Sequence, residues 1–139
     1  MIVALDSSVL VASLDSSEPF HGKCDALMGE SHLHVAAHAL VETFSIFTGG
    51  RLRYRLSASD TTLLIRESIL PAVTTVTLDG PELVSAMGEC ESRGIRGGAI
   101  YDYLHLIAAR KAGAKRFFTL NLKDFQAFVR PGDPEILHP

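Results

Sequence analysis

The sequence contains no tryptophan, only two cysteines and no long apolar run. Cys24 and Cys90 are too few for the disulfide framework of a small secreted domain, and neither lies in a C-x-x-C or zinc-ligand spacing. We therefore expect both thiols to be reduced and buried. Apolar runs such as residues 9–12 are far shorter than the roughly 18 residues of a membrane span. Residues 1–5 carry no Lys or Arg, unlike a secretory signal, so we expect a cytoplasmic protein without a membrane segment.

Neither sign of charge dominates the chain. It has 13 Lys and Arg residues against 16 Asp and Glu residues, which gives a formal net charge of −3. Bulk positive charge therefore does not hold this protein to nucleic acid, and any such role needs a local basic patch or a metal ion. The 47% hydrophobic content is typical of a globular protein. We expect residues 1–139 to form a single domain.

Apolar or β-branched segments alternate with segments of helical periodicity along the whole chain. Residues 2–5 are continuously apolar, as in a strand that is covered on both faces of a parallel sheet. We expect strands at 2–5, 34–36, 74–78 and 116–120, and helices at 9–14, 19–28, 37–47, 60–69, 79–94 and 100–111. This alternation predicts a three-layer α/β domain, with a mainly parallel central sheet flanked by helices. Ligands of such sheets bind beyond the carboxyl ends of the strands.

Asp6 follows the first expected strand directly and is hard to explain by packing. A carboxylate beside four buried residues must cap a helix, pair with a charge or bind a cation. N-capping of the next helix is the simple alternative, although Ser7 and Ser8 are also available for that role. Asp6 and Asn121, which follows the last expected strand, are both predicted to lie at the carboxyl edge of the sheet.

Glu42 and Asp102 lie on expected helices. In the helix of Glu42, the residues Leu40, Phe44 and Phe47 form an apolar stripe, and Glu42 lies roughly opposite, which is typical of a solvated position. Asp102 lies near the start of its helix, where a carboxylate interacts favourably with the helix N-terminus. Taken singly, neither position indicates a function.

Taken together, these segments resemble the PIN domain, the PilT N-terminus nuclease fold. The resemblance rests on ALDSSVLVASL near the start of the chain, HALVETFSIF around Glu42, YDYLHLIAARKAGA around Asp102, and FFTLNLKDF at residues 117–125. It covers nearly the whole chain, in the right order and length. The stand-alone size is similar to that of the VapC toxins of bacterial and archaeal VapBC toxin–antitoxin pairs.

The resemblance implies an endoribonuclease that depends on Mg²⁺ or Mn²⁺. By position, Asp6 is the strand-end aspartate, Glu42 the glutamate of an early helix and Asp102 the aspartate of a late helix. These three are the implied catalytic residues and metal ligands. The family's fourth acidic position is held here by Asn121, and the nearest carboxylate, Asp124, is expected to compensate in part. This departure weakens the case for a second metal ion.

The chemistry of these residue types agrees with that role. Magnesium prefers oxygen ligands and keeps several waters, so two or three convergent carboxylates suffice to hold it. The ion makes a water nucleophilic near neutral pH and stabilises the charge that develops during phosphodiester hydrolysis. Three neighbouring carboxylates also repel one another, so the metal-free cluster is expected to bind protons more readily than isolated acids do.

Two other patterns are weaker indications of a ligand site. His32, His34 and His38 form H-x-H-x-x-x-H, but the acidic residue that a metallohydrolase needs between the second and third histidines is missing. We therefore expect surface or helix-start histidines rather than zinc ligands. Gly97 and Gly98 precede a helix without the glycine pattern of a phosphate-binding loop, which favours a tight turn.

Two basic concentrations are candidates for RNA contact. Arg51, Arg53 and Arg55 alternate with Leu52 and Tyr54 and would share one face if the segment were extended. They are therefore possible RNA-binding residues, with a solvated surface as the alternative. A second concentration lies in the half of the chain that carries Asp102, and it consists of Arg93, Arg96, Arg110, Lys111, Lys115 and Arg116.

The function implied by the resemblance is that of a toxin in a toxin–antitoxin pair. It would cleave tRNA or rRNA, be inhibited by a cognate antitoxin protein and form a homodimer. The alternative is a catalytically weakened PIN-like module that binds RNA or protein, which only Asn121 supports. A phosphotransferase of the haloacid dehalogenase type also places an aspartate after its first strand, but it needs D-x-D, and Ser8 stands two residues beyond Asp6.

Overall fold

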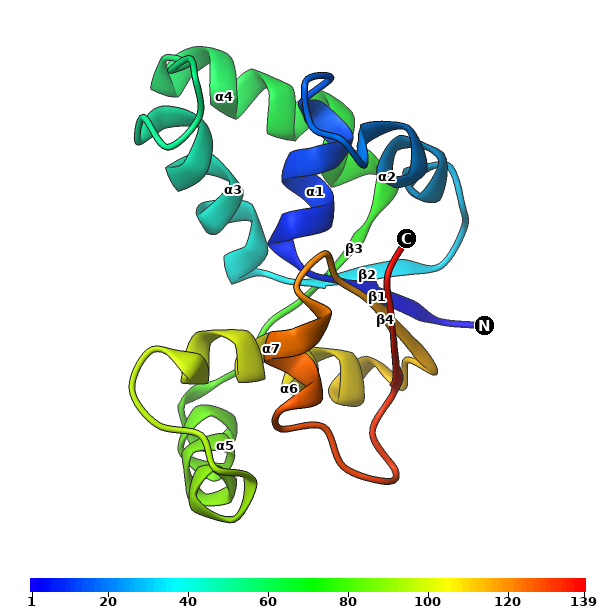
Figure 1. The fold of residues 1–139 in the computed structure, drawn as a ribbon, viewed down its shortest axis with the longest axis vertical. Helices are drawn as coiled ribbons and strands as arrows, with labels where there is room; N and C mark the ends of the chain where they lie inside the picture. Colours follow the sequence, from blue (N-terminus) through cyan, green and yellow to red (C-terminus); the bar gives the residue numbers. More distant parts are fainter.

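Five short parallel strands form the centre of the protein in the computed structural model, which describes all of residues 1–139 (Figure 1). The strands are β1 (Val3–Leu5), β2 (Leu33–Ala36), β3 (Thr74–Val76), β4 (Arg116–Phe118) and β5 (Glu135–Leu137). Their order across the sheet is β3-β2-β1-β4-β5, and every neighbouring pair is parallel. The predicted parallel sheet is confirmed, and β5 is a strand that the sequence did not predict.

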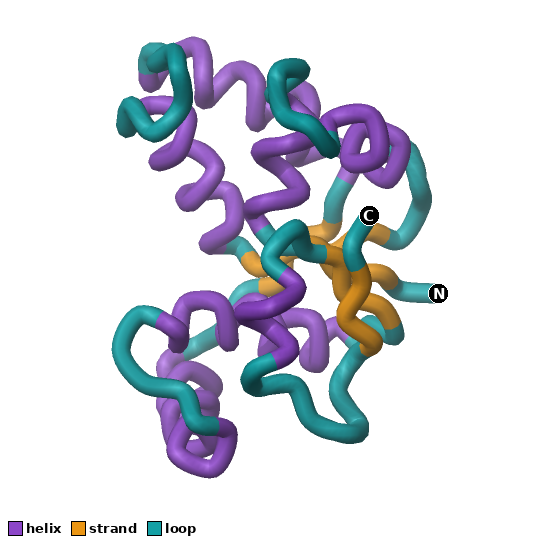
Figure 2. Tube along the Cα trace, in the orientation of Figure 1, coloured by secondary structure: helices purple, strands orange, loops and turns teal.

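Helices cover both faces of this sheet. They are α1 (Ser7–Leu14), α2 (His21–Met28), α3 (His38–Thr48), α4 (Ala58–Leu64), α5 (Gly80–Arg93), α6 (Ala99–Ala112) and α7 (Leu122–Gln126). After α4 the chain continues through a π-helical turn, Ile65–Ile69, and a 3₁₀ turn, Leu70–Ala72. Helices α1 to α4 lie on one side of the strands and α5 to α7 on the other (Figures 1 and 2), which confirms the predicted three-layer α/β fold. None of the helices is long and apolar enough to cross a membrane.

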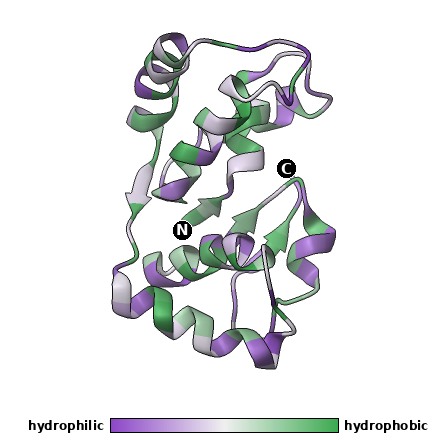
Figure 3. Cartoon of the chain, turned by 90° about the vertical axis from the view of Figure 1, so that its left-hand side faces the viewer, coloured by the Kyte–Doolittle hydropathy of each residue, from purple (hydrophilic) through white to green (hydrophobic).

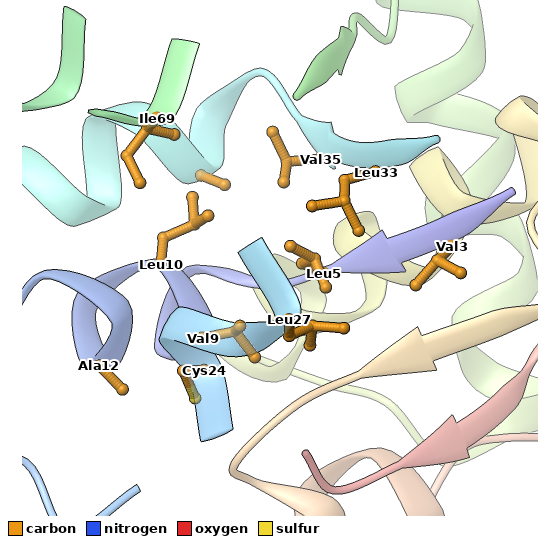
Figure 4. Close-up of a cluster of buried hydrophobic side chains, with 11 residues drawn as sticks. Val3, Leu5, Val9, Leu10, Ala12, Cys24, Leu27, Leu33, Val35 and Ile69 are labelled. Atoms are coloured by element: carbon orange, nitrogen blue, oxygen red, sulfur yellow. The ribbon is translucent and has the colours of Figure 1, made fainter. Parts of the chain in front are cut away.

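Alternation along β1 divides the hydrophobic core into two parts. Successive side chains of a strand point to opposite faces, so Val3 and Leu5 join one buried cluster and Ala4 joins the other. The first cluster lies under α1 and α2 and also contains Val9, Leu10, Cys24, Leu27, Leu33, Val35 and Ile69 (Figure 4). The second lies under α5 to α7 and contains Tyr103, Leu106, Phe117, Phe125 and Phe128. The strand that follows the N-terminus, β1, is accordingly drawn in the green of hydrophobic residues in Figure 3.

The apolar stripe on α3 is only partly buried. Ala39, Thr43 and Phe47 are buried, whereas Leu40 and Phe44 are half-buried. Both sets follow helical spacing, so periodicity alone did not separate them. Thr43 tolerates burial because its Oγ1 donates a hydrogen bond to the carbonyl oxygen of Ala39 at 2.8 Å.

Both cysteines are free thiols, as expected, but only one of them is buried. Cys24 belongs to the core under α1 and α2. Cys90 is half-buried, so the prediction for this residue was wrong. It lies on α5, an outer helix whose only buried residue is Ala86. The other residues of this helix are at least partly exposed to solvent.

Two glycine positions fix where α6 begins. Gly94 ends α5 with a φ of 70°, and Gly97 adopts a φ of 61° in the turn that follows. Positive φ is unfavourable for residues with a Cβ, so glycine suits both places. The predicted tight turn at Gly97 and Gly98 is confirmed, and it places Asp102 in the first turn of α6.

Candidate functional site at the carboxyl edge of the sheet

Asp6 lies at the carboxyl end of β1, where the chain turns into α1. Its Oδ1 accepts hydrogen bonds from the backbone N–H groups of Ser8 at 3.1 Å and Val9 at 3.4 Å. Asp6 is therefore the N-cap of α1, and neither Ser7 nor Ser8 takes that position. Asp6 is only 3% exposed. If it also binds a metal ion, the same buried carboxylate must serve both as helix cap and as ligand.

Two hydroxyl groups hold the Asp6 carboxylate through its two oxygens. Ser8 Oγ donates to Oδ1 at 2.5 Å, and Thr119 Oγ1 donates to Oδ2 at 2.6 Å. These hydroxyl oxygens also accept backbone N–H groups after β4, from Leu120 and Asn121 respectively, both at 3.0 Å. The network ties the start of α1 to the segment before α7 and fixes the orientation of the carboxylate. The sequence analysis did not predict this network. The spacings D-x-S, from Asp6 to Ser8, and T-x-N, from Thr119 to Asn121, could have indicated it.

Burial raises the pKa of Asp6 above its ordinary value. The charge of His105 and the hydrogen bonds from Ser8, Thr119 and Val9 act in the opposite direction and do not outweigh it. A nearby cation would offset the cost of burying this negative charge. Asp6 is therefore a helix cap whose buried negative charge a nearby cation would stabilise.

Asp102 is half-buried in the first turn of α6 and lies within electrostatic reach of the other acids. Burial raises its pKa first of all, and the negative charges of Asp6, Asp124 and Glu42 raise it further, against an opposing contribution from His105. The fold thus brings these four carboxylates into one region, although they come from four different elements. The direction of this pKa shift agrees with the repulsion expected among the acids, although burial is its largest cause.

Glu42 is engaged by a histidine that the sequence analysis did not single out. Its Oε1 lies 2.6 Å from His105 Nε2 and 3.8 Å from His38 Nε2. Burial would raise the pKa of Glu42, but the hydrogen bond from His105 and the charges of both rings together lower it. Glu42 was predicted as a solvated position or a metal ligand, and its side chain, which is 34% exposed, forms a hydrogen bond with His105.

The closest group of potential metal ligands is not the predicted set of three acids. His38, Glu42 and His105 each offer a ligand atom, and these atoms lie within 4.8 Å of one another. The carboxylates of Asp6, Glu42 and Asp102 do not form such a group. Glu42 lies instead beside the two imidazole rings, and its Oε1 is within hydrogen-bond distance of His105 Nε2.

Several of the predicted site residues line two separate surface hollows. The first, which we call the α3 hollow, has a volume of about 320 Å³ and is lined by Ser7, Ser8, Glu42, Ser45, Ile46, Arg51 and Asn121. The second, the α6 hollow, has a volume of about 470 Å³, and its charged lining residues are Arg93, Asp102, Lys123 and Asp124. Asn121 therefore shares a hollow with Glu42, and Asp124 shares the other with Asp102.

The basic segment Arg51, Arg53 and Arg55 is not extended. It runs through a series of bends between α3 and α4, so the three side chains do not share the face that alternation in a strand would give. All three are exposed, and Arg51 lines the α3 hollow. The short loop must reverse direction between two packed helices, which prevents an extended conformation.

Half of the second basic concentration is paired with carboxylates of the protein itself. Carboxylate partners hold three of its members, in the pairs Arg93 with Asp133, Arg110 with Glu89 and Lys111 with Glu82. Of these pairs, the first is the most buried, with side chains 13% and 4% exposed. These three cations therefore contribute to the fold first of all.

The histidine pattern H-x-H-x-x-x-H does not form a ligand set as a whole. His34 lies in β2, and its Nδ1 contacts the carbonyl oxygen of His32 at 3.0 Å. His38, the first residue of α3, is the only member that joins a group of potential metal ligands. His38 is thus a helix-start histidine, as expected, His32 is exposed, and the potential ligand partner of His38 comes from α6.

Two solved structures share this fold over nearly the whole chain. Mycobacterium tuberculosis VapC20, named as a sarcin-ricin loop cleaving toxin, aligns with a TM-score of 0.71 and 18% identity over 95% of this chain and 99% of that chain. A chain of the VapBC2 structure from Rickettsia felis, bound to a DNA fragment from their promoter, aligns with a TM-score of 0.68 and 15% identity, over 99% and 98%. At these identities the likeness concerns the fold alone.

Sequence similarity is also found. The chain is 27% identical to the protein named ribonuclease VapC27 of Mycobacterium tuberculosis over 113 residues, which cover 81% of this chain and 80% of that protein. The sequence family described as PIN domain matches residues 3–129, a range that includes every predicted site residue. This chain therefore belongs to the PIN domain family.

Proposed function

We propose that this chain is a metal-dependent endoribonuclease and the toxin of a toxin–antitoxin pair. The observation that carries the proposal is the buried Asp6 carboxylate at the carboxyl end of β1, which Ser8 and Thr119 hold by hydrogen bonds. The raised pKa of Asp102, whose causes include the charges of Asp6, Asp124 and Glu42, supports it. Ligands of parallel sheets bind at the carboxyl edge of the sheet. The similarity to a protein named ribonuclease VapC27 supports the same reaction class.

Asp6 and Asp102 would hold the ion, either Mg²⁺ or Mn²⁺, with Glu42 as the third ligand. Their carboxylate oxygens are the ligands that these cations prefer. The raised pKa values of Asp6 and Asp102 fit a cation, since burial leaves both negative charges insufficiently compensated. When bound, the ion supplies an activated water near neutral pH and stabilises charge on the phosphate.

The surrounding residues of the chain would orient both the acids and the RNA. Ser8 and Thr119 keep the Asp6 carboxylate in one orientation, because each hydroxyl also accepts a backbone N–H. Arg51 places a positive charge beside Glu42 in the α3 hollow, where an RNA phosphate can be bound. Arg53 and Arg55 are exposed next to it and would contact neighbouring phosphates.

RNA cleavage by the purified chain tests this proposal. Incubation with end-labelled tRNA and with a ribosomal RNA fragment, in Mg²⁺ or Mn²⁺, is expected to give discrete fragments that EDTA abolishes. The choice of these RNAs follows from the family resemblance and from VapC20, which is named as a sarcin-ricin loop cleaving toxin. A folded protein that cleaves neither RNA in either ion would contradict the proposal.

A catalytically weakened module that binds RNA or protein is the second candidate. Asn121 favours it, since a neutral amide stands where the resemblance implies a fourth acid. Binding of the same RNAs without cleavage, in the same assay, is the result that this candidate predicts.

Asn121→Asp is expected to lower the Mg²⁺ concentration for half-maximal cleavage about five-fold, the equivalent of about 1 kcal/mol for one added charge near the ion. Asp124→Ala is expected to raise it by a similar factor, because Asp124 contributes negative charge beside Asp102. The measurement is a Mg²⁺ titration of cleavage rate for the parent and both variants. Unchanged titrations in both would mean that neither position belongs to the metal site.

The proposal also includes a cognate antitoxin protein that inhibits the enzyme, with both partners in the cytoplasm. The likeness to a chain of the VapBC2 structure supports such a pair. Co-expression of the toxin with the protein encoded beside it is expected to abolish the RNA cleavage described above. A cleavage rate that the co-purified partner leaves unchanged would count against this part of the proposal.

Light scattering is expected to give a mass of twice 15.0 kDa, because we propose a homodimer. An apolar groove of about 380 Å³ beside α3 is lined by Leu40, Val41, Phe44, Ile65 and Leu70. Val41 is 67% exposed, and exposed apolar patches of this kind mark protein contacts. Val41→Asp is expected to give the monomer. A parent protein that stays monomeric at micromolar concentrations would remove the claim.

A further inference from the structure

We infer that His38, Glu42 and His105 form a binding site for Zn²⁺, separate in its ligand chemistry from the acidic centre. This inference goes beyond the proposed function and does not depend on RNA cleavage. It concerns two histidines for which the proposed reaction has no use and which nevertheless lie beside one of its acids. The site is built from two elements, α3 and α6, on the inner side of α3.

The backbone brings the three side chains together without distortion. His38 and Glu42 are four residues apart on α3, so they lie on the same face of the helix, one turn from each other. His105 reaches them from α6, with its ring centroid 4.3 Å from that of His38. Its side chain is only 1% exposed, so it is held in this position by the core around it.

The distances suit a small cation with nitrogen and oxygen ligands. Zinc binds imidazole nitrogen and carboxylate oxygen at about 2.0–2.2 Å, so its tetrahedral ligands lie about 3.4 Å from one another. The distances from Glu42 Oε1 to the Nε2 atoms of His105 and His38 are 2.6 and 3.8 Å, which bracket that value. Small side-chain rotations would equalise them, and no pair of ligand atoms exceeds 4.8 Å.

An unpartnered nitrogen atom faces the same group of side chains. His38 Nε2 is buried and makes no hydrogen bond, although it lies on the side of the ring that faces Glu42. Buried polar atoms in proteins nearly always have a partner, and an ion is one of the accepted explanations when they do not. The ion pair of Glu42 with His105 leaves this nitrogen unexplained, whereas a bound Zn²⁺ would use all three ligand atoms. The ion does not provide a partner for His105 Nδ1, which is also buried and unpartnered.

The donor set distinguishes this site from the acidic centre. Two imidazole nitrogens and one carboxylate, with the fourth position open, are typical of zinc and other transition metals. Magnesium prefers oxygen ligands and has little affinity for imidazole. Asp6 and Asp102, in contrast, provide only oxygen atoms. The two sites are therefore expected to select different ions, although Glu42 lies between them.

Calorimetric titration of Zn²⁺ into the metal-free full-length protein tests the inference. We expect one tight site per chain in the parent and a loss of affinity of at least about 10-fold in His38→Ala and in His38→Gln. His38 is the residue to change, because its side chain is 32% exposed and its removal leaves the core intact. Circular dichroism and thermal melting check that both variants are folded.

Two matched controls locate the ion. His34→Ala removes another partly exposed histidine, which has no part in the group, and is expected to leave the affinity unchanged. Asp102→Asn removes a proposed ligand of the acidic centre and is expected to weaken Zn²⁺ binding far less than His38→Ala does, because Asp102 provides no ligand atom to this group. An undiminished affinity in both His38 variants would overturn the inference, and so would a loss of Zn²⁺ binding in Asp102→Asn equal to that in His38→Ala. None of these outcomes depends on whether the chain cleaves RNA.

Discussion

Asp6→Asn and Asp102→Asn should each reduce RNA cleavage by at least about 100-fold, because each removes a charged ligand worth several kcal/mol of transition-state stabilisation. The side-chain volume is nearly unchanged in both substitutions, and an asparagine at position 6 remains a good N-cap for α1. The comparison is of initial cleavage rates at saturating Mg²⁺ for the parent and the two variants. Asp25→Asn, at an exposed position on α2 that lines neither hollow, removes the same charge and should retain full activity.

The Asp102 substitution should also stabilise the metal-free protein at neutral pH. The pKa of Asp102 is raised in the fold above the ordinary 3.8, so the folded state binds this proton more tightly than the unfolded chain does. The favourable contribution is complete below the ordinary pKa and is lost as the pH rises through the folded value. At pH 7 the ionised Asp102 therefore destabilises the fold, and asparagine relieves that cost.

Thermal melting in EDTA measures this second effect. At pH 7 we expect a higher Tm for Asp102→Asn than for the parent, with the difference vanishing as the pH falls to the ordinary pKa of 3.8. A variant that is both inactive and more stable would indicate a charge retained for function at the expense of stability. Full cleavage activity in a folded Asp6→Asn or Asp102→Asn protein would falsify the assignment of the acidic centre.

The positions of Asp6 and Asp102 could be predicted because topology determines them. Strands covered on both faces are continuously apolar, and such strands alternate with helices only in parallel sheets, whose carboxyl ends lie at one edge. Asp6 follows β1 immediately, and so it lies at that edge whatever the details of packing. Asp102 follows a glycine turn that fixes the first turn of α6.

The environment of Glu42 could not be predicted in the same way. His105 lies 63 residues away in sequence, and the two meet only because α6 packs under β2, from whose end α3 begins. A glutamate on the polar side of an amphipathic helix is usually solvated, so the local pattern favoured the wrong environment. The hydrogen bond from Thr119 to Asp6 could not be predicted either. Thr119 follows β4, and only the pairing of β4 with β1 brings it to Asp6.

The sequence patterns also failed to predict two short elements. The α7 helix has five residues, and β5 has three, which is too few for either period to be recognised. The existence of β5 depends on pairing with β4, and α7 is held by the burial of Phe125 in the core under α5 to α7. Tertiary contacts, rather than local preference, therefore determine both elements.

Breaking the ion pair of Arg93 with Asp133 is expected to be the most destabilising of the charge substitutions. The pair joins the last turn of α5 to the loop before β5, and Arg93 also donates to the carbonyl oxygen of Phe128 at 3.3 Å. Its guanidinium lies 5.2 Å from the centre of the Tyr103 ring, which is fully buried. Asp133 in turn accepts the backbone N–H of Arg130 at 2.9 Å, which closes the loop.

Asp133→Ala should therefore lower the free energy of unfolding by about 3 kcal/mol, because it leaves the Arg93 charge buried without its partner. Urea denaturation at pH 7 measures the loss. Glu89→Ala is the matched control: it removes the nearer of the two carboxylate partners of Arg110, whose side chain is 38% exposed, and should cost less than about 1 kcal/mol. A double variant that replaces Arg93 by Met and Asp133 by Leu should regain much of the loss, since no unpaired charge then remains. Equal costs for Asp133→Ala and Glu89→Ala would show that burial adds nothing to this pair, and the α5 end would then be held by packing alone.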